Sequence, residues 1–240
     1  MKNFFLLIAL FLPLASALGQ EKIHILLVTG GHGFEEKPFF EMFDSLSPGK
    51  LTYDHVIQPA ANALYHQPQI KQYDAVVFYD MWQPISEQEK KAFLALLKKG
   101  KGMVFLHHSL VSYQLWPEFK AIIGGKYYDK EGDPTEQNIP RSTFHHGVQV
   151  DVQIIDNQHF ITKDFKDFQL FDEVYGTTMV LPSVHPLLKT NHPLSTEVIG
   201  WAHQYGKSKI VYLQPGHGKE TYGSPAYRTL LLNSILWVTQ

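Results

Sequence analysis

Three short apolar runs, each followed closely by a polar motif of glycine or histidine, most constrain what this chain can fold into. The runs are Ile25 to Val28, Met103 to Leu106 and Ile210 to Leu213. Uninterrupted apolar segments of this length are typical of strands buried on both faces of a parallel sheet. In such sheets, ligands bind beyond the carboxyl ends of the strands. The sequence therefore predicts an α/β fold with a polar site at one edge of the sheet.

Strands and helices alternate over residues 21–240, which we interpret as one domain because no linker-like segment divides them. One helix is marked by a capping box of Ser86 and Glu89, and a closing helix by Ser224 before Pro225. Further strands are predicted at residues 52–57, 73–79, 180–181, 187–190 and 198–201. Alternating apolar residues over 148–154 predict an antiparallel strand at the edge of the sheet or in an insertion. The predicted fold is an α/β sandwich with a mostly parallel central sheet.

The first twenty residues have the features of a secretory signal peptide. A single charge at Lys2 precedes an apolar stretch from Phe4 to Leu14 and the small-residue pattern Ala15-Ser16-Ala17. An uncleaved anchor is the alternative, but the stretch is shorter than the ~20 residues that a spanning helix needs. We therefore expect an exported protein, periplasmic or extracellular, with no membrane attachment after cleavage.

Composition excludes several classes of function. The formal net charge is −2, with 21 basic and 23 acidic residues, which does not favour a nucleic-acid partner. The chain has no cysteine, so neither a disulfide framework nor a thiol nucleophile is available. Ser109 could replace a thiol, but it lacks the G-x-S-x-G elbow of a serine hydrolase.

Histidines follow all three buried runs, and we expect them to converge on one cleft. His32 lies in Gly30-Gly31-His32-Gly33, His107 ends the central run, and His217 stands between two glycines. The glycine-rich turn could instead cradle a phosphate or serve only as a tight turn, but it lacks both nucleotide-binding patterns. Because successive strand residues point in opposite directions, we expect His107 rather than His108 to face the cleft unless the chain turns sharply.

Five segments together resemble a known family. They are Val28 to Gly33, Gly102 to His107, Asp172 to Tyr175, Gly200 to Lys207 and Gly216 to Gly218. In order and spacing they resemble the trehalose-utilisation, or ThuA-like, proteins, whose fold is similar to that of class I glutamine amidotransferases. The resemblance implies a flavodoxin-like three-layer sheet, a polar pocket and an association with sugar metabolism. Amidotransferases carry a nucleophilic cysteine after the central strand, whereas this chain has His107 and His108, so thiol-dependent glutamine hydrolysis is excluded.

The resemblance also adds Glu173 and Tyr175 to the histidine cluster. We predict His107, Glu173 and His217 as catalytic residues, because a carboxylate among imidazoles can orient them, act as a base or join them around a metal. A divalent ion such as zinc suits a histidine-rich, cysteine-free site, with His32, His107 and His217 as candidate ligands. No close ligand motif such as H-E-x-x-H is present, so metal-free acid–base chemistry stays open.

A small carbohydrate is the predicted ligand. Aromatic rings with polar tips suit stacking against sugars, and the predicted substrate-binding residues are His32, Tyr79, Trp82, His146 and Tyr175. His145 and His159 are further candidates for the rim. A hydrolase, lyase or isomerase acting on a glycoside or oxidised sugar is the leading hypothesis, and a non-catalytic sugar-binding module is the alternative.

Overall fold

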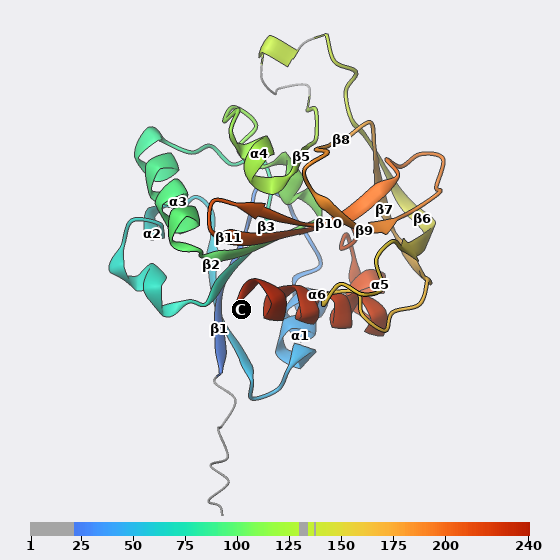
Figure 1. Cartoon of the computed structure of the whole chain (residues 1–240), viewed down its shortest axis with the longest axis horizontal. Coiled ribbons are helices and arrows are strands. Elements are labelled where there is room, and N and C mark those ends of the chain that lie inside the picture. The colour runs from blue at the N-terminus through green and yellow to red at the C-terminus, as the bar shows by residue number, and fades with distance from the viewer. Residues whose placement is uncertain (1–21, 130–133, 137) are drawn as a thin grey trace, which may run out of the picture.

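The computed structural model describes residues 22–129, 134–136 and 138–240. Within these residues, one nine-stranded sheet has the order β2-β1-β3-β4-β11-β10-β9-β6-β7 (Figure 1). The strands are β1 (Ile23–Gly30), β2 (Leu51–Ile57), β3 (Ala75–Asp80), β4 (Gly102–Leu106), β6 (Thr143–Ile154), β7 (Phe168–Gly176), β9 (His185–Lys189), β10 (Val198–Tyr205) and β11 (Ser208–Leu213). A separate ribbon pairs β5 (Gly125–Lys126) with β8 (Met179–Val180).

The five strands from β2 to β11 in that order are parallel, and the three apolar runs lie in β1, β4 and β11. Every residue of β3 and β4 is buried, because helices cover both faces of this part of the sheet. The prediction of buried parallel strands at the three apolar runs is confirmed. Their carboxyl ends lie at one edge of the sheet, which is where the histidine motifs follow.

Helices form a layer on each face of the sheet (Figure 1). One layer contains α1 (Glu36–Leu46), α5 (Lys219–Tyr222) and α6 (Pro225–Val238), and the other α2 (Ala60–Leu64), α3 (Glu87–Lys99) and α4 (Phe119–Ile123). Short 3-10 helices are η1 (Pro68–Gln72), η2 (His107–Val111) and η3 (Pro134–Glu136). Alternate residues of β1 serve the two layers, since Ile25 and Leu27 belong to one core cluster and Leu26 and Val28 to the other. The predicted three-layer α/β sandwich is confirmed.

Capping residues begin two of these helices as the sequence predicts. The Ser86 hydroxyl accepts the N–H of Glu89 at 3.3 Å, and the Glu89 carboxylate accepts the N–H of Ser86 at 2.7 Å. At α6 the Ser224 hydroxyl accepts the N–H of Tyr227 at 3.4 Å, with Pro225 in the first turn. These caps fix the ends of one helix in each layer.

The remaining strands β10, β9, β6 and β7 are antiparallel to their neighbours. The alternation over residues 148–154 lies in β6, which is antiparallel to both neighbours as predicted. It is second from the edge of the sheet, because β7 forms the edge. The apolar pattern does not predict β7, because Asp172 and Glu173 interrupt it, yet both side chains are buried there. The edge strand β7 therefore places two buried acidic side chains, Asp172 and Glu173, inside the domain.

The predicted signal peptide, residues 1–20, lies outside the described residues. Among the residues that are described, no helix is both long and apolar enough to cross a membrane.

Candidate functional site

The central strand β4 ends in a sharp turn at His107. This residue has φ 49°, a left-handed conformation that is uncommon outside glycine, and it begins η2. Because the chain turns here, His108 does not point away from the site as it would in a continuing strand. Its ring lies 5.3 Å from that of His107 and 5.0 Å from that of His32. Both histidines therefore lie in the cluster. The expectation that only His107 would face it does not hold, because the chain turns sharply at this point.

Asp172 and two tyrosines hold the loop that carries His217. The Asp172 carboxylate accepts the backbone N–H of Gly216 at 2.8 Å and that of His217 at 2.9 Å. From the other side, Tyr79 donates to the carbonyl of Gly216, and Tyr222 to that of His217, both at 2.9 Å. This buried network fixes the backbone of the loop and hence the position of the His217 ring.

Glycine is required before His32. Gly31 has φ 82°, and a Cβ atom there would lie 1.8 Å from the carbonyl oxygen of Met81. The tight turn therefore needs glycine for its own geometry, and it also presents His32, whose ring lies 6.4 Å from that of His217. The motif therefore has both roles that the sequence suggests, a turn that requires glycine and a segment that presents His32.

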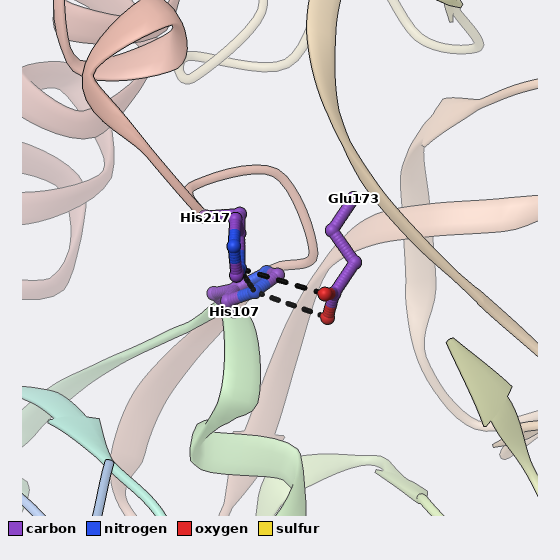
Figure 2. Close-up of side chains that lie close together, drawn as sticks. All are labelled: His107, Glu173 and His217. Atoms are coloured by element: carbon purple, nitrogen blue, oxygen red, sulfur yellow. Dashed lines mark hydrogen bonds and ion pairs between the residues drawn. The ribbon is translucent and has the colours of Figure 1, made fainter. Parts of the chain in front are cut away.

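The donor atoms of His107, Glu173 and His217 face one another (Figure 2). His107 Nε2 lies 3.2 Å from His217 Nδ1 and 3.5 Å from Glu173 Oε1, and His217 Nδ1 lies 3.5 Å from Glu173 Oε2. The side chains of His107 and Glu173 are buried, whereas His217 is partly exposed. The predicted convergence of His32, His107 and His217 is thus observed, and Glu173 contacts His107 and His217.

The hydrogen bond from His107 to Gln214 fixes which nitrogen faces the cluster. His107 Nδ1 lies 2.7 Å from the carbonyl oxygen of Gln214, and a carbonyl only accepts, so Nδ1 carries the hydrogen. In the neutral ring the lone pair is then on Nε2, which also lies 3.0 Å from the hydroxyl of Tyr175. This is the arrangement by which proteins orient a metal-binding imidazole through its second nitrogen.

Electrostatics divide the cluster into a charged pair and neutral imidazoles. Burial disfavours charge on His107, but its contact with Glu173 outweighs this and raises the pKa of His107. Burial likewise opposes ionisation of Glu173, but the facing His107 lowers the pKa of Glu173. Burial, reinforced by neighbouring His107, lowers the pKa of His217 and His32 and takes that of His108 well below its ordinary value. The last three favour the neutral form.

Several polar atoms at the site have no hydrogen bond within the described residues. They are His32 Nδ1, His108 Nε2 and Glu173 Oε2. Glu173 Oε2 does lie close to Nδ1 of His146, whose side chain is 54% exposed at the mouth of the cluster, but without hydrogen-bond geometry. The buried nitrogens of His32 and His108 that have no hydrogen bond to the described residues indicate a site that is completed by a ligand or an ion.

The predicted site residues do not all have the predicted surroundings. Trp82 is 53% exposed and its ring lies 6.4 Å from that of His32, as a sugar-stacking residue requires. Tyr79 is 1% exposed and supports the loop of His217 from below, so its burial does not fit direct sugar contact. Tyr175 is also buried, with its hydroxyl against His107. His159 packs on Trp237 instead of lining the rim.

Sequence reasoning gave no role to Asp172 or Gln214. Asp172 appears only as part of a family motif, and Gln214 contributes through a backbone carbonyl, which no side-chain pattern signals. The family motif is the only sequence signal for Asp172, because its burial in β7 is seen only in the structure.

The profile of ThuA, described as trehalose utilisation, matches residues 24–238. The chain belongs to the ThuA family. Comparison with curated proteins finds no significant match. Among solved structures, a ThuA-like protein from Parabacteroides merdae has a TM-score of 0.74 at 18% identity, covering 92% of this chain and 91% of that one. One from Bacteroides uniformis has 0.71 at 21% identity, covering 93% and 94%.

The ThuA chain also shares its fold with a glutamine amidotransferase from Thermotoga maritima. The TM-score is 0.51 at 14% identity, covering 92% of this chain and 99% of that one. This likeness extends to the architecture alone. At the turn after the central strand, where a thiol enzyme needs cysteine, this ThuA protein has His107 in the left-handed conformation.

Proposed function

We propose that this ThuA protein is an exported enzyme that acts on a carbohydrate at a divalent metal ion, zinc or a similar ion, held by His107, Glu173 and His217. The spacing of the donor atoms carries the proposal. With bonds of 2.0–2.1 Å, two ligands of a tetrahedral zinc ion lie about 3.3 Å apart. Here the two imidazole nitrogens lie 3.2 Å apart, and each lies 3.5 Å from an oxygen of the Glu173 carboxylate, His107 Nε2 from Oε1 and His217 Nδ1 from Oε2. One donor atom from each residue lies within 4.8 Å of the other two. His32, the third candidate from the sequence, is not part of this set.

The chemistry of the donors supports the same ion. Two imidazole nitrogens and one carboxylate form a three-ligand set of the type found in catalytic zinc sites, which keep a further position for water or substrate. A bound divalent ion would act as a Lewis acid on a sugar oxygen or as an activator of water.

The surrounding side chains would bind and orient the sugar. His32 has a buried Nδ1 that makes no hydrogen bond with the described residues, and it can form one with a sugar hydroxyl. His146, exposed at the mouth, can exchange a proton between substrate and solvent through its imidazole. Trp82 offers an exposed aromatic face to the same ligand. Trehalose utilisation is the description of the family, and it supports a sugar as the substrate class.

Metal-free acid–base catalysis is the second candidate, and the pair of His107 and Glu173 favours it. Their opposite pKa shifts describe an ion pair in which His107 holds a proton on Nε2. That proton could be delivered to a leaving oxygen, with Glu173 stabilising the charged ring. A sugar-binding module is the third, since binding alone needs no titratable pair.

Elemental analysis of the protein purified without a histidine tag separates these candidates. We expect about one divalent ion per chain, lost in His217→Ala and Glu173→Gln and retained in His66→Ala, which changes an exposed histidine elsewhere. Protein with and without metal is then incubated with a panel of glycosides and oxidised sugars, and products are followed by NMR. Turnover without metal supports the acid–base candidate, and tight binding without turnover supports the binding module.

A further inference from the structure

A cavity of about 540 Å³ has Trp82 in its lining. One wall is formed by Trp82 to Ile85 and another by Tyr113 to Trp116, with Lys90 and Asp129 completing the lining. The volume lies in the range of about 300–1,000 Å³ typical of pockets for small molecules. Trp82 belongs to both places, because its ring lines the cavity and stands 6.4 Å from the ring of His32. Trp82 is thus the residue that links the cavity to the cluster, since neither His32 nor His107 nor His217 is among the lining residues.

The two walls are held in place from behind. Trp82 and Tyr113 both have left-handed backbone conformations, with φ 53° and 50°, which bulky residues adopt only where their surroundings enforce it. The N–H of Tyr113 donates to the carbonyl of Gln83 at 3.1 Å and joins the walls. The indole N–H of Trp82 donates to Asp129 at 2.8 Å, which fixes the orientation of the ring, and 53% of the residue stays exposed.

Most polar groups of the cavity are already engaged. Lys90 pairs with Glu87 at 2.7 Å, and the Gln83 amide donates to the carbonyl of Met81 at 2.6 Å. Gln114 Oε1 is buried and accepts no hydrogen bond within the described residues. A second sugar ring brings several hydroxyls that each need a partner, whereas an aromatic ring with one polar substituent needs few. The lining therefore suits a flat apolar group better than a sugar.

We propose that this cavity binds an aromatic aglycone of a glycoside whose sugar lies at the histidine cluster. This inference rests on the proposed function, because it places the sugar at His107, Glu173 and His217. The aglycone ring stacks on the indole of Trp82 and contacts Leu115, which is 68% exposed. A hydroxyl on the ring donates to Gln114 Oε1. The substrate class is thus narrowed to aryl glycosides.

Titration calorimetry on the full protein as purified tests the cavity, with 4-nitrophenyl glycosides of glucose, galactose and mannose as probes and the matching methyl glycosides as references. For one sugar of the three, we expect the aryl glycoside to bind about tenfold more tightly, the effect of one stacking contact. Trp82→Ala should remove this preference, and Trp82→Phe should keep most of it. Phe160→Ala, which removes an exposed aromatic ring elsewhere, should change nothing.

Leu115→Lys is a second variant that leaves the buried core unchanged. It should also weaken the binding of aryl glycosides while leaving that of methyl glycosides unchanged. Equal affinity for methyl and aryl glycosides, or tighter binding of a disaccharide such as cellobiose, overturns the proposal.

Binding of free 4-nitrophenol separates this inference from the proposed function. If 4-nitrophenol binds in a way that depends on Trp82 while no metal or turnover is found, aromatic binding in the cavity is supported and the proposed function is rejected. If turnover depends on His107 but Trp82→Ala changes the affinity of no ligand, the proposed function is supported and aromatic binding in the cavity is rejected.

Discussion

Asp172 positions His217 without touching its side chain. Its carboxylate accepts the backbone N–H of His217 at 2.9 Å, and it also accepts those of Gly216 and Glu173, each at 2.8 Å. One buried carboxylate thus holds the loop of one candidate ligand and the backbone of another. The geometry of the centre depends on a residue that supplies no donor atom to it.

The first prediction is that Asp172→Asn weakens metal binding about tenfold to a hundredfold, the effect of losing a residue that orients ligands. An amide cannot accept the N–H bonds of both Gly216 and His217 in the same way, so the loop should shift. Competition with a chromophoric zinc chelator measures the affinity. Asp151→Asn serves as the control, because Asp151 is exposed on β6 and its carboxylate accepts a hydrogen bond from Gln169, away from the site. Unchanged affinity in Asp172→Asn would show that the loop holds without it.

Removing the metal should lower thermal stability. A ligand present at a thousand times its dissociation constant stabilises the folded state by about 4 kcal/mol, which corresponds to a decrease in Tm on the order of 10 °C upon removal. Differential scanning calorimetry before and after treatment with a chelator measures the change. Adding zinc should restore the Tm in the parent protein but not in His217→Ala. An identical Tm with and without chelator contradicts the metal proposal.

Asp80 provides a test of stability against pH. It is fully buried at the end of β3, and burial raises its pKa to about 6 from an ordinary 3.8. Between these values the folded state binds more protons than the unfolded state, so stability falls as the pH rises through this window and the loss is complete above it. Asp80→Asn should therefore raise the free energy of unfolding at pH 8 by up to about 3 kcal/mol and have little effect near pH 4.

Urea denaturation of the parent and Asp80→Asn at both pH values measures this difference. Because both proteins share every other titrating group, their difference isolates Asp80. An equal effect at pH 4 and pH 8 would mean that lost hydrogen bonds, such as that from Gln58 at 3.2 Å, dominate instead.

Two glycines of one turn should respond differently to alanine. At Gly31 a Cβ atom would meet the Met81 carbonyl oxygen at 1.8 Å in a left-handed backbone, whereas at Gly33 it would meet no atom of the described residues within 4 Å. Gly31→Ala should cost about 2–4 kcal/mol through overpacking and backbone strain, and Gly33→Ala close to nothing. Chemical denaturation compares the two variants. Equal stability would show that the turn relaxes freely.

Export predicts a processed amino terminus. If the apolar stretch from Phe4 to Leu14 directs secretion, mass spectrometry of protein from the native host should find a terminus near Leu18 to Glu21. An intact Met1 in soluble cytoplasmic protein would contradict both the signal peptide and the exported location.

The sequence by itself determined the layers of the fold and the edge that carries the site. The uninterrupted apolar runs before His32, His107 and His217 require burial on both faces, and parallel strands bring their carboxyl ends to one edge. The helix caps at Ser86 and Ser224 are equally local, because capping depends on residues within one helical turn. Such short-range signals are contained in the order of the residues.

Only the tertiary structure decided which donor atoms meet. Glu173 reaches the centre from β7, an edge strand whose polar residues hide its apolar pattern, and its place in the sheet depends on pairing with β6 far from the parallel strands. Likewise, the turn at His107, the burial of Tyr79 beneath the loop of His217 and the upright ring of Trp82 follow from contacts between residues distant in the chain. Distances between atoms are set by packing of the whole domain, so no local pattern contains them.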